Sequence, residues 1–128
     1  MNKKGQLLIH IVEDNFVYSF ILKAALEDYY NSKITTFATG EECIAMLDNN
    51  PDIIILDYNL NEGMNRIDTF KMIHSQKPTI PVIVVSSQID TQVVADFFKL
   101  GVTDYIEKKS GEQAILQIKE AILKAIKK

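Results

Sequence analysis

Five short hydrophobic runs alternate along the chain with longer segments whose apolar residues recur every three or four positions. The runs are rich in β-branched residues, and we expect them to be strands of a buried sheet, at residues 7–12, 33–38, 53–57, 81–85 and 102–106. Helices are expected between and after them, at residues 16–30, 40–47, around Phe70, at 91–100, and across the isoleucines at 115, 118, 122 and 126. This alternation predicts a doubly wound α/β fold, because parallel strands need crossover helices, which then cover both faces of the sheet.

Polar residues and a glycine mark where several of these helices begin and end. Asn15 is a suitable N-cap for the first helix, and either Asp90 or Thr91 can cap the fourth. Gly101 favours the end of that fourth helix. In the first helix, Phe20 and Ile21 have helical spacing with two alanines, which predicts that they form its apolar face.

Acidic residues stand at the ends of two hydrophobic runs. Glu13 and Asp14 follow the first run, and Asp57 ends the third. Ligands of open α/β sheets bind outside the carboxyl ends of the strands, so we expect the three carboxylates to meet at one edge. Like charges held that close resist joint ionisation unless a cation joins them. The sequence therefore predicts a divalent metal site beside a reactive carboxylate.

Composition and charge narrow the classes of protein that remain. The 128 residues match one ordinary domain, expected to span 1–128 without a linker, and 47% are hydrophobic while 24% are charged. The net charge of -3 argues against direct nucleic-acid binding. Cys43 is the one cysteine and cannot form an internal disulfide. No apolar stretch approaches the roughly 20 residues of a membrane helix, so we expect a cytoplasmic protein without membrane insertion.

The acidic residues belong to a longer pattern that resembles a known family. Glu13, Asp14, Asp57, Ser86 and residues 104–108 (DYIEK) resemble the receiver domain of two-component response regulators, the CheY-like family, over nearly the whole chain. The resemblance implies a flavodoxin-like (βα)5 fold whose five parallel strands have the order 2-1-3-4-5. It also implies a phosphorelay protein that accepts a phosphoryl group from a histidine kinase or a histidine phosphotransfer protein. Such a protein catalyses only its own phosphorylation and dephosphorylation, and it switches a surface that binds a downstream protein.

The same resemblance assigns a phosphoacceptor and a metal site. Asp57 would form the aspartyl phosphate, because a carboxylate can attack phosphorus when its charge is screened. Glu13, Asp14, Asp57 and the main-chain carbonyl of Asn59 would hold Mg²⁺, a hard cation that prefers oxygen ligands. Magnesium is therefore the expected cofactor.

Three further residues receive roles from the resemblance. The Lys108 ammonium and the Ser86 hydroxyl would contact phosphoryl oxygens and stabilise the charge that develops during transfer. Ser86 would then move toward the phosphoryl group and let the Tyr105 ring turn inward. The surface formed by the fourth helix and the fifth strand would change as a result.

Several positions depart from the family pattern. Lys109 stands where proline usually follows the late lysine, so the peptide after Lys108 could be cis or trans. Asn61 replaces a common proline, one residue is inserted around 62–63, and Arg66 falls where glycine is usual. These changes affect the rim of the expected site, and therefore the choice of partner more than the chemistry.

Other functions stay open at this point. A pseudo-receiver that binds partners constitutively would fit the altered positions Lys109 and Arg66. An aspartyl-phosphate phosphatase of the haloacid dehalogenase type would need a second aspartate where this chain has Asn59. A flavin carrier would need a phosphate-binding loop after the first strand, whereas Glu13 and Asp14 would repel the phosphate. The sequence also leaves open whether the chain acts alone or belongs to a longer protein.

Overall fold

Strands and helices alternate throughout the computed structural model, which describes residues 5–27, 29, 31–58, 66–87, 90–108 and 111–126. The strands are β1 (Leu7–Val12), β2 (Ser32–Phe37), β3 (Ile53–Tyr58), β4 (Val82–Ser86) and β5 (Asp104–Glu107). The helices are α1 (Phe16–Glu27), α2 (Gly40–Ala45), the short 3-10 helix η1 (Leu47–Asn49), α3 (Arg66–Gln76), α4 (Thr91–Leu100) and α5 (Gly111–Ile126). The five predicted strand–helix units are all present.

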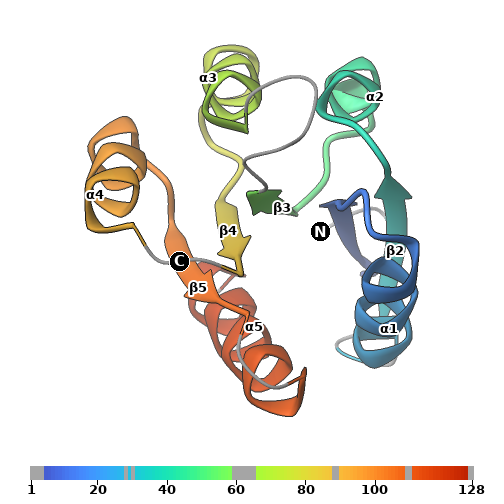
Figure 1. Cartoon of the computed structure of the whole chain (residues 1–128). Helices are drawn as coiled ribbons and strands as arrows, with labels where there is room; N and C mark the ends of the chain where they lie inside the picture. The colour runs from blue at the N-terminus through green and yellow to red at the C-terminus, as the bar shows by residue number, and fades with distance from the viewer. Residues whose placement is uncertain are drawn as a thin grey trace.

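The strands form one parallel sheet in the order β2-β1-β3-β4-β5 (Figure 1). The predicted strand order is therefore confirmed. The chain leaves β1 toward β2 on one side and returns to β3 on the other, so the winding reverses between β1 and β3. Val12 pairs with Leu56 across these two strands. That register brings the carboxyl ends of β1 and β3 side by side, where this fold binds its ligands.

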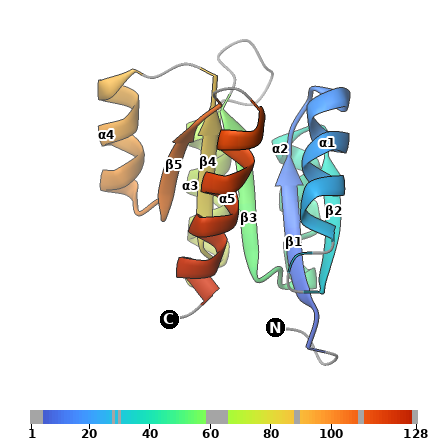
Figure 2. The same cartoon turned by 90° about the horizontal axis from the view of Figure 1, so that it is seen from below.

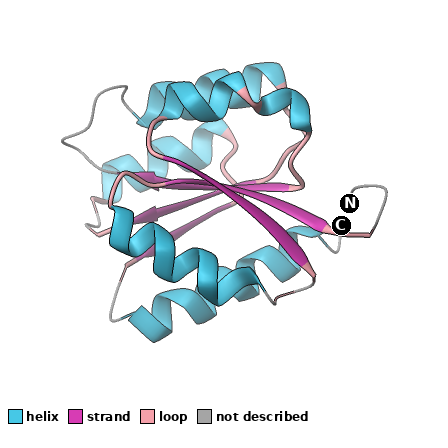
Figure 3. Ribbon diagram, turned by 90° about the vertical axis from the view of Figure 1, so that its right-hand side faces the viewer, coloured by secondary structure: helices cyan, strands magenta, loops and turns pink. Residues whose placement is uncertain are grey.

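Helices cover both faces of the sheet and enclose two hydrophobic cores. Helices α1 and α5 lie on one face (Figure 2), and Figure 3 shows the sheet between the two helical layers. The core on the α1–α5 face includes Ile9 and Ile118, and the core on the opposite face includes Phe70 and Phe97. Among the described helices, none is both long enough and apolar enough to cross a membrane.

The apolar face predicted for α1 is wrong. Its buried residues are Ser19, Leu22 and Leu26, whereas the side chains of Phe20 and Ile21 are exposed. The helix carries apolar residues around more of its circumference than the sheet can cover, so spacing alone did not identify the buried face. An exposed apolar stripe remains on the outside of α1.

Hydrogen bonds at the two ends of α4 explain where this helix and the strand after it begin. Asp90 is the N-cap of α4, because its carboxylate accepts hydrogen bonds from the backbone of Gln92 and Val93. Gly101 ends α4 with a φ of 106°, as predicted. The Val102 N–H then donates to the carbonyl of Phe97, so Val102 still closes the helix. The fifth strand therefore begins two residues later than predicted.

Candidate functional site

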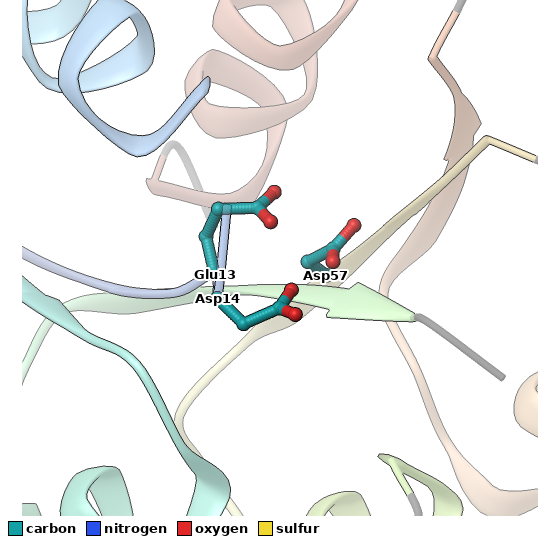
Figure 4. A group of neighbouring side chains, drawn as sticks. All are labelled: Glu13, Asp14 and Asp57. Atoms are coloured by element: carbon teal, nitrogen blue, oxygen red, sulfur yellow. The ribbon is translucent and has the colours of Figure 1, made fainter. Parts of the chain in front are cut away.

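Three carboxylates meet at the carboxyl ends of β1 and β3. One oxygen each from Glu13, Asp14 and Asp57 lies within 4.8 Å of the others. Figure 4 shows the three carboxylates gathered in one region, two from the segment after β1 and one from β3. Glu13 and Asp57 are only 4% and 3% exposed. The edge of the sheet where the sequence placed these acids is thus a compact, mostly buried anionic cluster.

The turn between β1 and α1 fixes the direction of the Glu13 side chain. The Glu13 N–H donates to the carbonyl of Phe37 at 2.9 Å, which extends the contact with β2 by one residue. Its Oε2 accepts a hydrogen bond from the Asn15 N–H at 3.0 Å. Asn15 in turn caps α1, because its Oδ1 accepts from the Tyr18 N–H at 3.0 Å. The helix cap and the anionic cluster are therefore parts of one hydrogen-bonded turn.

Lys108 joins the cluster from the residue that follows β5. Its Nζ lies 2.7 Å from Asp57 Oδ1 and 2.9 Å from Glu13 Oε1. Its N–H donates to the Ser86 carbonyl at 2.7 Å, so the end of β4 fixes its main chain. The same ammonium lies 4.2 Å from the centre of the Tyr18 ring. Lys108 therefore has contacts with β3, β4 and α1.

Burial and charge shift the pKa values of Glu13 and Lys108. Burial, followed by the charge of Asp57, raises the pKa of Glu13 to about 7, against the opposing effects of Lys108 and the Asn15 N–H. Burial alone would lower the pKa of Lys108, but the ion pairs with Asp57 and Glu13 outweigh it and raise that pKa. One ammonium cannot balance three carboxylates. The oxygen-only donor set and its excess negative charge fit a hard divalent cation such as Mg²⁺.

Ser86 and Tyr105 lie next to each other beside this cluster. Ser86 is the buried last residue of β4, one pairing step beyond Asp57, since Asp57 pairs with Val85. Burial raises the pKa of the Tyr105 hydroxyl, and the neighbouring Ser86 side chain partly offsets that rise. The Tyr105 ring lies 5.9 Å, between ring centres, from Phe97 of α4. The two residues predicted to act as a switch therefore connect β4 with α4 and β5.

Some predicted positions lie outside the described residues. These include Asn59 with its main-chain carbonyl, Lys109, Asn61 and residues 62–63. Arg66 begins α3. Whether the peptide between Lys108 and Lys109 is cis or trans therefore stays open.

Sequence reasoning missed Tyr18 as a member of the site. The available signal was an aromatic residue in the first turn of α1, four positions after Asp14. A first-turn side chain of α1 can reach the carboxyl edge of the sheet, because this helix starts there. Its contact with Lys108 joins residues 90 positions apart in the chain, which a local pattern does not reveal.

Comparison with known proteins identifies the family. Residues 9–120 match the family model described as the response regulator receiver domain. The chain belongs to this receiver family. A protein-glutamate methylesterase/protein-glutamine glutaminase 2 from Paramagnetospirillum magneticum is 34% identical over 116 residues. The match covers 87% of this receiver domain but 32% of that relative, so the chain spans about a third of the relative's length.

Two solved structures have the same fold. The phosphorylated cyanobacterial phytochrome response regulator RcpA is 28% identical, with a TM-score of 0.78 over 91% of each chain. The response regulator domain of Thermotoga maritima CheB is 23% identical, with a TM-score of 0.83 over 95% of this chain and 97% of that one. The predicted resemblance to CheY-like receivers is confirmed. Receiver domains bind Mg²⁺ in an acidic pocket, and here Glu13, Asp14 and Asp57 form a cluster that could hold a metal.

Proposed function

We propose that this receiver domain accepts a phosphoryl group on Asp57 from a histidine kinase or a histidine phosphotransfer protein, in a Mg²⁺-dependent reaction. One observation carries the proposal: the buried Asp57 carboxylate lies in a cluster with two further carboxylates and in ion-pair contact with Lys108. A nucleophile, an oxygen-rich cation site and a fixed ammonium are the parts that phosphoryl transfer needs. The phosphorylated state reported for RcpA is consistent with this proposal.

The reaction follows from these contacts. A carboxylate oxygen of Asp57 attacks the phosphorus of the donor phosphohistidine and forms an acyl phosphate. The P–N bond breaks, and its electron pair stays on the imidazole nitrogen of the donor, which then takes up a proton. Mg²⁺, held by Glu13, Asp14, Asp57 and the Asn59 carbonyl, would screen the negative charges of the carboxylates and the phosphoryl group.

Lys108 and Ser86 would stabilise the transferred group. The Lys108 ammonium already lies 2.7 Å from Asp57 Oδ1, so it is positioned to contact phosphoryl oxygens as their charge develops. The Ser86 hydroxyl can donate to another phosphoryl oxygen. A movement of Ser86 toward that oxygen would free space for the Tyr105 ring and change the surface of α4 and β5 that faces a downstream protein.

Chemical labelling tests the proposed function. The full chain is incubated with Mg²⁺ and phosphoramidate, and intact mass and peptide mapping follow the product. We expect a mass gain of one phosphoryl group on Asp57 that is stable in acid, labile in base and absent when a chelator removes the metal. A folded protein that stays unlabelled over a range of donor concentrations would instead identify a pseudo-receiver that binds partners constitutively.

The exposed stripe of α1 is the proposed contact surface for the phosphodonor protein. Phe16 is 82% exposed and Phe20 is 66% exposed, and Val17 and Ile21 extend the same stripe. Phe16 begins α1 two residues after Asp14, so a protein bound to this stripe also lies beside the carboxylate cluster. A phosphohistidine must approach that cluster. The apolar stripe would supply contact area next to it without entering the site.

Phe20→Glu should separate docking from chemistry. We expect it to slow transfer from a phosphorylated histidine phosphotransfer domain by roughly 10- to 30-fold, because a charge replaces a large apolar contact. Labelling by phosphoramidate should not change, because this donor needs no protein surface. The rates are measured by radiolabel transfer and intact mass.

Phe98→Glu is the matched control for that experiment. Phe98 is also an exposed phenylalanine but lies on α4. Transfer from the same donor should proceed at the wild-type rate in this variant. Equal slowing in the two variants would mean that α1 is not the docking surface.

A further inference from the structure

We propose that Tyr18 is a positioning residue, whose ring face holds the Lys108 ammonium in the site. The inference rests on the proposed function, in which Lys108 assists phosphoryl transfer. Tyr18 comes from the first turn of α1 and Lys108 from the end of β5, and they meet at the anionic cluster. Tyr18 would act through Lys108, without contact with the reacting atoms.

The geometry fits an attraction between a cation and an aromatic ring. Lys108 Nζ lies 4.2 Å from the Tyr18 ring centre, within the roughly 6 Å over which such contacts are favourable. The Lys108 side chain is largely buried, which strengthens the attraction because little water competes for the ammonium. Lysine carries its charge on a flexible four-carbon stem, so a contact that restricts the stem also restricts where the charge acts.

Tyr18 is itself held in place. Its N–H donates to the capping side chain of Asn15, and its ring packs against the hydrophobic core on the α1–α5 face. The Tyr18 hydroxyl is buried and has no hydrogen-bond partner among the described residues. The ring face therefore supplies the polar interaction of this side chain with the site, and the hydroxyl is dispensable for it.

The ring contact differs in kind from the other two contacts of the ammonium. Glu13 and Asp57 pair with Lys108, but they are also the proposed ligands of Mg²⁺. A metal ion on these carboxylates would weaken their attraction for the ammonium, because the two cations would share the same negative charge. The Tyr18 ring takes no part in metal binding, so its hold on Lys108 persists when the carboxylates change partner. This contact would keep the ammonium close to Asp57 during transfer.

Two variants of Tyr18 separate the ring from the hydroxyl. Tyr18→Leu removes the ring, and we expect it to slow labelling by phosphoramidate at saturating Mg²⁺ by about 3- to 30-fold. Tyr18→Phe keeps the ring and should label at the wild-type rate. Tyr29→Leu is the control, because the Tyr29 ring contacts a different lysine. The Nζ of Lys119 lies 5.6 Å from the centre of the Tyr29 ring.

A double-mutant cycle tests whether Tyr18 acts through Lys108. In a Lys108→Met background, Tyr18→Leu should cause no further loss of labelling rate, because the group that it positions is already absent. Equal slowing by Tyr18→Leu in both backgrounds would overturn the proposal. Slowing by Tyr18→Phe as large as that by Tyr18→Leu would also overturn it, because the hydroxyl would then be responsible.

A metal-free measurement examines the contact without phosphorylation. Protons beside the Lys108 ammonium should show an upfield NMR shift from the ring current of Tyr18, retained in Tyr18→Phe and lost in Tyr18→Leu. Absence of this shift in the wild-type protein contradicts the proposal, even if Tyr18→Leu fails to fold. If the wild-type chain shows the shift but takes no phosphoryl group, the proposed function fails while the contact stands.

Discussion

Asp57→Asn should abolish labelling of the chain by phosphoramidate. The amide has nearly the same shape as the carboxylate but lacks the anionic oxygen that would attack phosphorus, and Asp57 is buried in contact with Lys108. The rate should fall to background, as followed by intact mass with Mg²⁺ present. Asp57→Asn also removes one of three potential metal ligands, so Mg²⁺ should bind more weakly.

Asp48→Asn provides the control for that loss. The Asp48 side chain is fully exposed on η1 and makes a long 3.9 Å contact with Lys77. This variant should label at the wild-type rate. A phosphoryl group that still appears on Asp57→Asn, stable in acid and labile in base, would show that another carboxylate is the acceptor.

Lys108→Met should lower the labelling rate strongly and, at the same time, raise the affinity for Mg²⁺. Labelling by phosphoramidate should slow by roughly 10²- to 10³-fold, as when an enzyme loses one donor to a developing negative charge. Mg²⁺ should bind more tightly, because the variant removes a positive charge that lies 2.7 and 2.9 Å from oxygens of two proposed ligand residues, Asp57 and Glu13. Calorimetry measures the affinity, and intact mass measures the rate.

The metal-free stability of Lys108→Met gives a further check. Without the ammonium, the buried carboxylates of Glu13 and Asp57 lose their shared partner, so thermal unfolding should begin at a lower temperature. Added Mg²⁺ should recover part of this loss. Lys119→Met, at a half-buried lysine of α5 that contacts Tyr29 and not the carboxylate cluster, should change neither labelling nor Mg²⁺ affinity. Weaker Mg²⁺ binding in Lys108→Met would mean that Lys108 organises the carboxylates more than it competes for them.

The order of the elements could be predicted because the three central strands, β1, β3 and β4, are nearly continuous apolar runs. Residues 53–56 are buried on both sides of the sheet, and this leaves little ambiguity about a central parallel strand. The buried face of helix α1 was harder to predict. Its sequence offers apolar residues on more than one face, and only packing against the sheet shows that Leu22 and Leu26 face inward while Phe20 does not. Apolar spacing alone could not choose between these faces.

The candidate site could likewise be predicted only in part. Topology alone predicted that Glu13, Asp14 and Asp57 would meet, because the ends of β1 and β3 must be neighbours in this sheet. The two ion pairs of Lys108 and its contact with Tyr18 depend on side-chain directions across residues 13 to 108, which no local pattern contains. Sequence reasoning therefore found the anions, and predicted a metal for them, but did not find the aromatic residue beside them.

The hydrogen bond from the Lys108 N–H to the Ser86 carbonyl has a consequence for how such chains can diversify. This hydrogen bond fixes the main chain of Lys108 to the end of β4, one residue before position 109. Substitutions at position 109 can then accumulate without displacing the ammonium. A lineage could lose its proline there, reshape the neighbouring rim to suit a new interaction partner, and keep an ancestral reaction intact.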